Sequence, residues 1–255
     1  MAIVQSMLAR STNRTLLWVA FASALTAASC EKGGVIASDD FEQTELSASW
    51  DVRKFVPGAV QMQGDVVRTG ERAAQITLRP GDQIPTEKGT RLERAELQEP
   101  RNVEALLNTN YEYAFSLRIP EDFPISSTRL VIAQWKQRCL AASCTPDNPT
   151  LAVRYESGQL FLTHQVGDRR EELYRQAADV RGQWLDFRTA LRFSHAQDGL
   201  IRMWINSTQV AEYRGVNAYP TAGYGDRFYF KVGLYRDAMP VLMSIFLDDY
   251  RKALR

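Results

Sequence analysis

Residues 228–236 alternate strictly between apolar and polar side chains, in the order Phe-Tyr-Phe-Lys-Val-Gly-Leu-Tyr-Arg. Successive side chains of an extended strand point to opposite faces. One face of this segment is therefore predicted to contact a core: Phe230, Val232 and Leu234. The opposite face carries the reactive groups and a glycine: Tyr229, Lys231, Gly233 and Tyr235. Because Gly233 has no side chain, it would let a ligand approach the backbone between the lysine and the second tyrosine.

Two further segments show the same arrangement of polar residues along one face. In residues 130–136, Gln134 and Lys136 stand two apart, with Trp135 on the other face. In residues 94–98, the polar side chains again alternate with apolar ones: Arg94, Glu96 and Gln98 against Ala95 and Leu97. The sequence therefore predicts three strands that present rows of polar side chains.

These three motifs, R-x-E-L, Q-x-K and Y-F-K-x-G-x-Y, resemble the cleft strands of jelly-roll polysaccharide lyases. That group contains alginate lyases, glucuronan lyases and lyases of the heparin lyase I type. The resemblance covers roughly residues 40 to 250 in strand order. It implies an all-β fold, a two-sheet β-jelly roll of the concanavalin or lectin-like type, with a curved groove.

The resemblance also implies a reaction, the cleavage of a uronic-acid polymer by β-elimination. Such a reaction needs a group that neutralises the sugar carboxylate, a base that removes the C5 proton and an acid for the leaving oxygen. By resemblance, Arg94 and Gln134 would hold the carboxylate, and Tyr235 would be the base, the acid or both in turn. A free tyrosine has a pKa of about 10, so as a base it needs a neighbouring positive charge, which Lys231 is predicted to supply.

Lys136 departs from the pattern, because much of the family has histidine at this position. A lysine acts as a point charge, so Lys136 is predicted to contribute electrostatics to catalysis rather than proton transfer. His164, on one face with Leu160 and Leu162, is the alternative base and a candidate substrate-binding residue. A satisfied core histidine is the competing interpretation of that position.

The other candidate substrate-binding residues lie on or near the same three strands. Glu96 is expected to orient Arg94, and Gln98 stands where many alginate lyases have arginine, which favours a glucuronan-like substrate over alginate or heparin-like ones. The remaining candidates extend the proposed subsites: Arg138, Tyr229 and Arg236.

Alternation continues through most of the chain and predicts half-buried strands. The expected strands are 111–119, 150–156, 159–165, 184–193, 200–206, 209–213 and 242–249. Ser157-Gly158 and Asn206-Ser207 are predicted hairpin turns, and a short helical turn is expected within 169–178.

The first 30 residues have the features of a secretory signal peptide: Arg10 and Arg14, an apolar run over 16–25, and small residues before Cys30. Cys30 fits a bacterial lipoprotein cleavage site, and ordinary cleavage with release is the alternative. Residues 31–38 are expected to be a tether and 39–255 a single lyase domain. The protein is accordingly expected to be exported, to the periplasm, the outer membrane as a lipoprotein, or the medium, with a lipid anchor as its only membrane contact.

Cys139 and Cys144 remain in the exported part and are predicted to form a disulfide in a loop, because no further metal ligands stand nearby. Removing Arg10 and Arg14 from the 31 basic residues leaves 29 against 30 acidic ones, a net charge of −1. Such a chain lacks the basic field of a nucleic-acid-binding protein. An anionic polysaccharide must then be attracted by locally placed arginine and lysine.

We therefore expect a monomeric polysaccharide lyase that requires no metal or other cofactor, with a structural calcium at Asp248 or loop carbonyls as the alternative. A non-catalytic, lectin-like carbohydrate-binding module is the competing function, which the absence of histidine at 136 favours. A glycoside hydrolase would need two carboxylates flanking the scissile bond, and the closely spaced acidic strand of jelly-roll hydrolases is missing.

Overall fold

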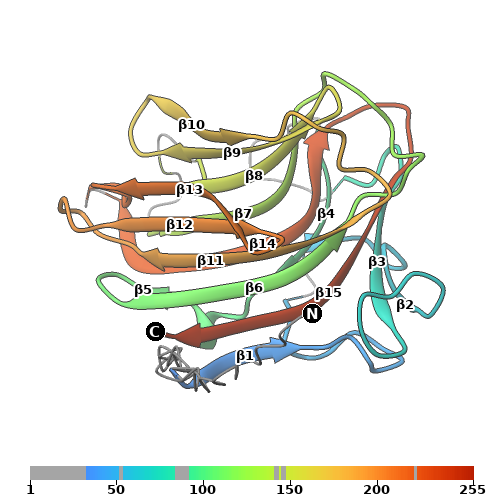
Figure 1. Ribbon diagram of the computed structural model, residues 1–255, viewed down its shortest axis with the longest axis horizontal. Coiled ribbons are helices and arrows are strands. Elements are labelled where there is room, and N and C mark those ends of the chain that lie inside the picture. The colour runs from blue at the N-terminus through green and yellow to red at the C-terminus, as the bar shows by residue number, and fades with distance from the viewer. Residues whose placement is uncertain (1–32, 52–53, 84–91, 141–143, 145–147, 221–222) are drawn as a thin grey trace, which may run out of the picture. The chain divides into compact units, whose positions relative to one another are not determined.

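A computed structural model describes residues 33–255 except 52–53, 84–91, 141–143, 145–147 and 221–222, and residues 32–255 form one compact unit. Two antiparallel sheets stack as layers without closing into a barrel (Figure 1). The larger sheet has eight strands in the order β13-β12-β11-β6-β15-β3-β2, with β1 also paired to β15. The smaller has seven, in the order β10-β9-β8-β7-β14-β4, with β5 also paired to β14. The predicted all-β, two-sheet jelly roll is confirmed.

The strands follow the alternation of the sequence closely. Their bounds are β1 Val35–Asp39, β2 Val60–Gln63, β3 Ala73–Leu78, β4 Leu92–Gln98, β5 Ala105–Leu106, β6 Asn110–Arg118, β7 Leu130–Cys139, β8 Leu151–Glu156, β9 Gln159–Gln165, β10 Arg170–Arg175, β11 Trp184–Arg192, β12 Leu200–Ile205, β13 Thr208–Arg214, β14 Tyr224–Asp237 and β15 Met243–Leu254. One 3-10 helix, η2, covers Arg101–Val103. Among the described residues no helix is long and apolar enough to cross a membrane.

Two local predictions were wrong, and both errors concern strands at sheet edges. Within the expected tether, residues from Val35 onward form β1, where Ser38 pairs with Arg251 of β15. Within 169–178, expected to turn as a helix, β10 pairs with β9 instead. β10 is polar and largely exposed, and β1 is a short Val-Ile-Ala run followed by two polar residues, so neither strand shows alternation of hydrophobicity. The predicted signal peptide, including Cys30, lies outside the described residues.

The two predicted hairpin turns are confirmed. Ser157 and Gly158 join β8 to β9, and Asn206 and Ser207 join β12 to β13, all with positive φ. Positive φ at both central residues is the backbone geometry of a tight type I′ hairpin, whose twist matches that of the flanking strands. The first turn fixes the register of β8 and β9 in the smaller sheet, and the second that of β12 and β13 in the larger sheet.

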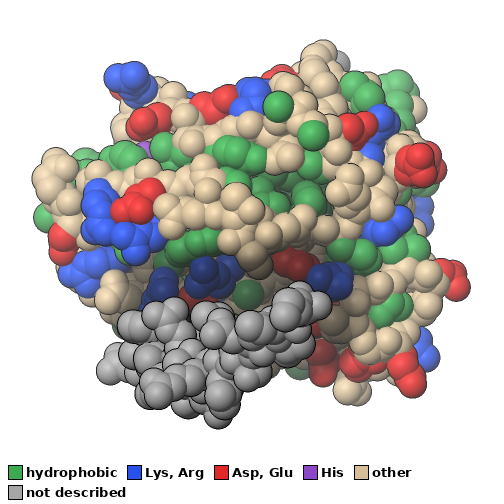
Figure 2. Space-filling model, in the orientation of Figure 1, with side chains coloured by type: hydrophobic (Ala, Val, Ile, Leu, Met, Phe, Trp, Pro, Cys, Tyr) green, Lys and Arg blue, Asp and Glu red, His purple; other side chains and the backbone are tan. Residues whose placement is uncertain are grey.

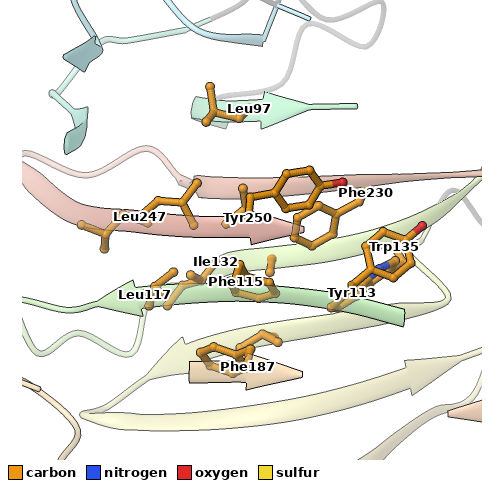
Figure 3. Packing of buried hydrophobic residues seen from close by; sticks show 14 of the residues in the cluster. Leu97, Tyr113, Phe115, Leu117, Ile132, Trp135, Phe187, Phe230, Leu247 and Tyr250 are labelled. Atoms are coloured by element: carbon orange, nitrogen blue, oxygen red, sulfur yellow. The ribbon is translucent and has the colours of Figure 1, made fainter. Parts of the chain in front are cut away.

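Aromatic side chains from both sheets meet in the core and hold β14 in place (Figure 3). The Phe230 ring of β14 lies 4.8 Å from Trp135 of β7 in its own sheet, between ring centroids. It also lies 5.3 Å from Phe115 and 5.5 Å from Tyr113, both on β6 of the larger sheet. Since Phe230 is anchored inward, its neighbours Tyr229 and Lys231 must point outward.

A buried polar cluster links the end of β4 to both sheets. The Glu99 carboxylate accepts hydrogen bonds from the Phe230 amide at 3.0 Å and from the Tyr250 hydroxyl at 2.5 Å, and it pairs with Lys252 at 3.1 Å. Burial raises the pKa of Glu99, and this effect outweighs the opposing influence of Lys252. A buried carboxylate is tolerated only when its oxygens are satisfied, so this cluster fixes β4 against β14 and β15.

On the face shown in Figure 2, cationic and acidic side chains lie beside one another, without a large field of one sign. The outward side chains of the larger sheet form exposed ion pairs, such as Arg202–Glu212 at 3.0 Å and Arg188–Glu112 at 3.4 Å. Exposed pairs of this kind contribute little to stability.

Candidate active site

The outer face of the seven-stranded sheet carries the predicted site residues. On β4, β14 and β7 the apolar alternates are buried between the sheets, and the polar ones point to the other side. We call this set the polar face: Arg94, Glu96, Gln98, Tyr229, Lys231, Tyr235, Gln134 and Lys136. Strand pairing brings them together, since Lys231 is the register partner of both Gln98 and Gln134, and Tyr235 that of Arg94.

Glu96 is the centre of the polar face. Its side chain is fully buried, and its carboxylate accepts a short hydrogen bond from Gln134 Nε2. Arg94 Nε lies 3.0 Å and Lys231 Nζ 3.8 Å from Glu96 Oε2. The Arg94 contact is an ion pair without the direction of a good hydrogen bond. This geometry agrees with the prediction that Glu96 orients Arg94. Glu96 contacts Gln134 and Lys231 in the same way and can orient them too.

Tyr235 lies between two guanidinium groups. The central carbon of Arg94 is 4.2 Å from the centroid of the Tyr235 ring, and that of Arg129 is 4.6 Å from it. Burial lowers the pKa of Arg129, but Asp237 and Tyr235 outweigh this effect and raise it overall. Lys231, four residues away on an extended strand, is about 13 Å from Tyr235 along the chain. Positive charge next to Tyr235 therefore comes from the arginines rather than from Lys231.

Lys231 has an unusual environment for a lysine. Only 4% of it is exposed, and burial is the main cause that lowers its pKa to about 7. Glu96 opposes this shift, whereas the positive charges of Arg94, Lys136 and Lys54 add to it. A lysine that titrates near neutral pH inside a cluster of charges is typical of functional sites.

Gly233 is required by the neighbouring strand rather than by a ligand. Its φ of +141° lies in the region that side chains avoid, and a Cβ there would stand 2.2 Å from the Ala95 carbonyl oxygen. The register between β14 and β7 shifts between Val232 and Tyr235. Gly233 therefore forms an irregularity that lets β4 pack closely while Tyr235 returns to the polar face.

Two of the candidate substrate-binding residues are paired with protein groups. Arg138 forms an ion pair with buried Glu104, and its guanidinium carbon lies 4.8 Å from the Tyr229 ring centroid. Lys231 Nζ lies 5.3 Å from the same ring. Tyr229 thus separates the Lys231 cluster from Arg138, and Arg138 flanks the cluster at one end.

The predictions for Arg236 and His164 were wrong. Arg236 is 0% exposed and forms an ion pair with Glu93 at 2.7 Å, because it shares the inward face of β14 with Leu234. His164 points between the sheets, where Nδ1 lies 2.8 Å from the Thr150 carbonyl oxygen and the ring lies 4.4 Å from that of Tyr213. Burial lowers the pKa of His164. Neither residue can contact a ligand on the polar face.

Arg129 and Arg154 belong to this region, although the sequence motifs did not include them. Arg129 immediately precedes β7 and reaches Tyr235 while it pairs with Asp237 at 2.8 Å. Arg154 is the outward residue between Val153 and Tyr155 on β8, both of which are buried in the core. The alternation within β8 predicts that Arg154 points away from the core. It does not predict which sheet β8 joins, and therefore not that Arg154 lies near the polar face.

The loop after β7 contains the predicted disulfide between Cys139 and Cys144. Within the described residues no group of three or more histidine, cysteine or acidic residues is placed to hold a metal ion. The Asp248 carboxylate instead accepts the amides of Arg68 at 3.0 Å and Asp249 at 2.9 Å. These bonds give Asp248 a structural role at the irregularity within β15, where the register with β6 shifts between Asp248 and Arg251.

Two surface cavities, of about 470 and 390 Å³, lie away from the polar face. The first is lined by residues that include Asp39, Asp249 and Arg251, and the second by residues that include Arg118 and Phe246. Both cavities contain acidic side chains, which would repel a polyanion: Asp39, Asp40 and Asp249 in the first, and Glu121 and Asp122 in the second. The polar face is therefore the better candidate for an active site.

A protein-family model described as Polysaccharide lyase matches residues 40–251. No curated protein sequence matches the chain. Among solved structures, the endo-β-1,4-glucuronan lyase of the fungus Trichoderma reesei is similar, with a TM-score of 0.65 and 22% identity over 82% of this chain and 92% of that one.

Two other solved structures share the fold at lower identity. The alginate lyase AlgAT5 of polysaccharide lyase family 7 has a TM-score of 0.55 and 16% identity, over 78% of this chain and 84% of its own. The cellulose induced protein Cip1 has a TM-score of 0.53 and 13% identity, over 85% of this chain and 96% of its own.

Proposed function

The chain belongs to the polysaccharide lyase family, and we propose on this premise that it cleaves a glucuronan-like polymer of uronic acid by β-elimination at the polar face. Family membership makes the protein a polysaccharide lyase with a polysaccharide substrate. The proposal concerns the polymer and the residues that perform the reaction.

One observation supports the proposal most strongly, namely the excess of cations over carboxylates around Tyr235 and Lys231. Cationic neighbours of these two residues include Arg94, Arg129, Lys136 and Lys54. The carboxylates beside them are the buried Glu96, which several partners share, and Asp237, which pairs with Arg129. The chain as a whole has no such excess. A local cationic surface of this kind matches a polymer with one carboxylate per sugar.

The arrangement fits the three requirements of β-elimination. Arg94 and Gln134, both held by Glu96, would bind the substrate carboxylate and stabilise the negative charge that develops as the C5 proton leaves. Tyr235 would take that proton and then deliver it to the C4 oxygen, whose bond to C4 breaks as the C4–C5 double bond forms. The guanidinium groups of Arg94 and Arg129, which contact its ring, would hold the tyrosine in position for this transfer.

Lys136 and Lys231 would then act through their charge. Lys231 in its protonated form would attract the substrate carboxylate, and Lys136, which pairs in register with Tyr229, would do so from the next strand. His164 is turned away from this face, and the other histidine, His195, lies in the loop between β11 and β12 of the larger sheet. Tyr235 is therefore the residue proposed for proton transfer.

Glucuronan is favoured over alginate for two reasons. Gln98 occupies the register position beside Lys231 where an alginate-type motif has arginine. The glucuronan lyase of Trichoderma reesei also shares the fold over nearly its whole length. We further propose that the protein is exported, which the features of residues 1–30 and the disulfide support.

The substrate is tested by recording the ultraviolet absorbance of unsaturated uronate ends during incubation with glucuronan, alginate and heparin. The proposal expects the fastest rise on glucuronan and none on glucuronan whose carboxyl groups have been reduced to alcohols. A faster rise on alginate or heparin would refute the preference. Binding of glucuronan without a rise on any polymer would favour the lectin-like alternative.

A further inference from the structure

Arg154 is a buried arginine whose charge is not balanced by a carboxylate. Only 5% of it is exposed, and its Nε donates a hydrogen bond to Thr163 Oγ1 at 2.9 Å. Within the described part of the chain, the two terminal nitrogens of Arg154 make no hydrogen bond and no ion pair. An arginine can donate five hydrogen bonds, so most of the donor capacity of this side chain is left for a ligand.

The neighbours of Arg154 make its position costly in the free protein. Burial and the positive charges of Arg170 and Arg129 lower its pKa to about 10, against the weaker opposing influence of Glu156 and Tyr235. Burying an uncompensated charge costs free energy that a hydrophobic residue would not. A structural role does not explain such a placement, whereas binding of an anion does.

Strand register places Arg154 beside the proposed proton-transfer residue. Tyr235 of β14 pairs with Val131 of β7, and Val131 pairs with Arg154 of β8. The two backbones are thus two strand spacings apart, roughly 10 Å. Val131, which lies between them in the row, is apolar and only 2% exposed, so Tyr235 and Arg154 are the polar side chains of this row on β14 and β8.

We propose that Arg154, with Arg129 and Arg170, forms a second anion subsite that binds another carboxylate of the same polyuronate chain, on the side of Tyr235 opposite Arg94. This inference rests on the proposed function and adds to it a specificity determinant. Arg94 and Gln134 would hold the carboxylate of the reacting sugar, and the Arg154 subsite would hold that of a sugar further along the chain. Polymers in which several units carry carboxylates would therefore be preferred.

The test measures the affinity of a glucuronan tetrasaccharide for the Tyr235→Phe protein by calorimetry, with and without Arg154→Gln. Loss of hydrogen bonds to a charged group is expected to weaken binding roughly ten- to a hundred-fold and to reduce the salt dependence of the affinity. The matched control is Arg188→Gln on the outer face of the other sheet, where affinity is expected to stay the same.

Stability separates a binding role from a structural one. Because Arg154→Gln removes a buried, uncompensated charge, thermal unfolding is expected at an equal or higher temperature than in the parent protein. If this variant does not fold, Arg170→Gln, which changes an exposed residue, is expected to weaken tetrasaccharide binding several-fold. In the otherwise wild-type enzyme, Arg154→Gln should raise KM for glucuronan and change kcat little.

Equal affinity of the parent and the Arg154→Gln protein, or no tetrasaccharide binding by either, would overturn the subsite. The proposed function has a separate readout in the turnover of the wild-type enzyme. Turnover of glucuronan together with unchanged affinity in Arg154→Gln would refute the subsite alone, whereas failure to cleave any polyuronate would refute the proposed function.

Discussion

Arg94 stacks on Tyr235, with 4.2 Å between its guanidinium carbon and the centroid of the ring, and the two residues are register partners on β4 and β14. The same Arg94 contacts the buried Glu96 at 3.0 Å. One side chain therefore connects the carboxylate-binding part of the site to the tyrosine, and its planar shape allows both contacts. A lysine could not make them together, because an ammonium group is compact and lacks the planar fork.

Arg94→Lys is expected to reduce kcat/KM for glucuronan by roughly ten- to a hundred-fold, since the stacking contact with Tyr235 and the proposed charge-assisted hydrogen bonds to the substrate carboxylate are lost. Initial rates of unsaturated-end formation measure the change. Arg188→Lys is the matched control, because Arg188 stacks on Trp204 at 3.8 Å on the other sheet. Equal rates in the two variants would show that Arg94 does not contact the substrate.

Glu96→Gln is expected to destabilise the fold by about 3 kcal/mol, because it removes the buried charge that Arg94 and Lys231 share. Urea unfolding gives the free energy. Glu112→Gln, in a partly exposed ion pair with Arg188, is expected to cost less than about 1 kcal/mol. Similar losses in both variants would contradict the central position of Glu96.

The lowered pKa of Lys231 predicts that the stability of the fold depends on pH. Its pKa is about 7 in the folded protein against an ordinary value of 10.5, so between these values the unfolded chain binds more protons. The free energy of unfolding of the wild type therefore gains from this group as the pH rises through that range. Below pH 7 the lysine is charged in both states, and the whole cost of its burial applies.

The free energy of unfolding of Lys231→Met minus that of the wild type should accordingly be most favourable to the variant below pH 7. Urea unfolding at a series of pH values should show this difference falling by up to about 1.4 kcal/mol per pH unit as the pH rises above 7. A difference that does not vary between pH 6 and pH 10 would mean that Lys231 stays protonated in the folded protein.

Gly233→Ala is expected to separate β4 from β14, because the new methyl group would meet the Ala95 carbonyl oxygen at 2.2 Å. Both stability and cleavage should fall sharply. Gly158→Ala is the control, since Gly158 also has positive φ but its nearest neighbour is an Ile125 side-chain carbon at 3.7 Å. Its cost should be near 1 kcal/mol, with cleavage unchanged. Normal cleavage in Gly233→Ala would show that the irregularity does not position Tyr235.

Alternation along the strands was enough to predict the fold class and most of the polar face. Phe230, Val232 and Leu234 are buried as expected, and Lys231 and Tyr235 lie on the other side. The same rule would have placed Arg236 inward with Leu234, where it pairs with Glu93. The error arose because Arg236 was assigned to the site by its proximity in sequence to Tyr235 rather than by its face.

The parts of the site that escaped prediction depend on pairing between distant strands. Tyr235, Val131 and Arg154 form a row only because β14-β7 and β7-β8 each contain a register shift. Such shifts follow from packing of the whole sheet, and no local pattern shows them. The assignment of positive charge near Tyr235 to Lys231 failed for a related reason, since Arg129 reaches the ring from before β7.

The central claim is that Tyr235 transfers the proton at the polar face, and Tyr235→Phe tests it most directly. The measurement is kcat for unsaturated-end formation from glucuronan, together with the dissociation constant of a glucuronan tetrasaccharide. We expect kcat to fall by roughly 10²- to 10⁴-fold, the usual contribution of a general acid or base, while the dissociation constant changes less than about threefold. A Tyr235→Phe enzyme that keeps most of its wild-type kcat would contradict the account.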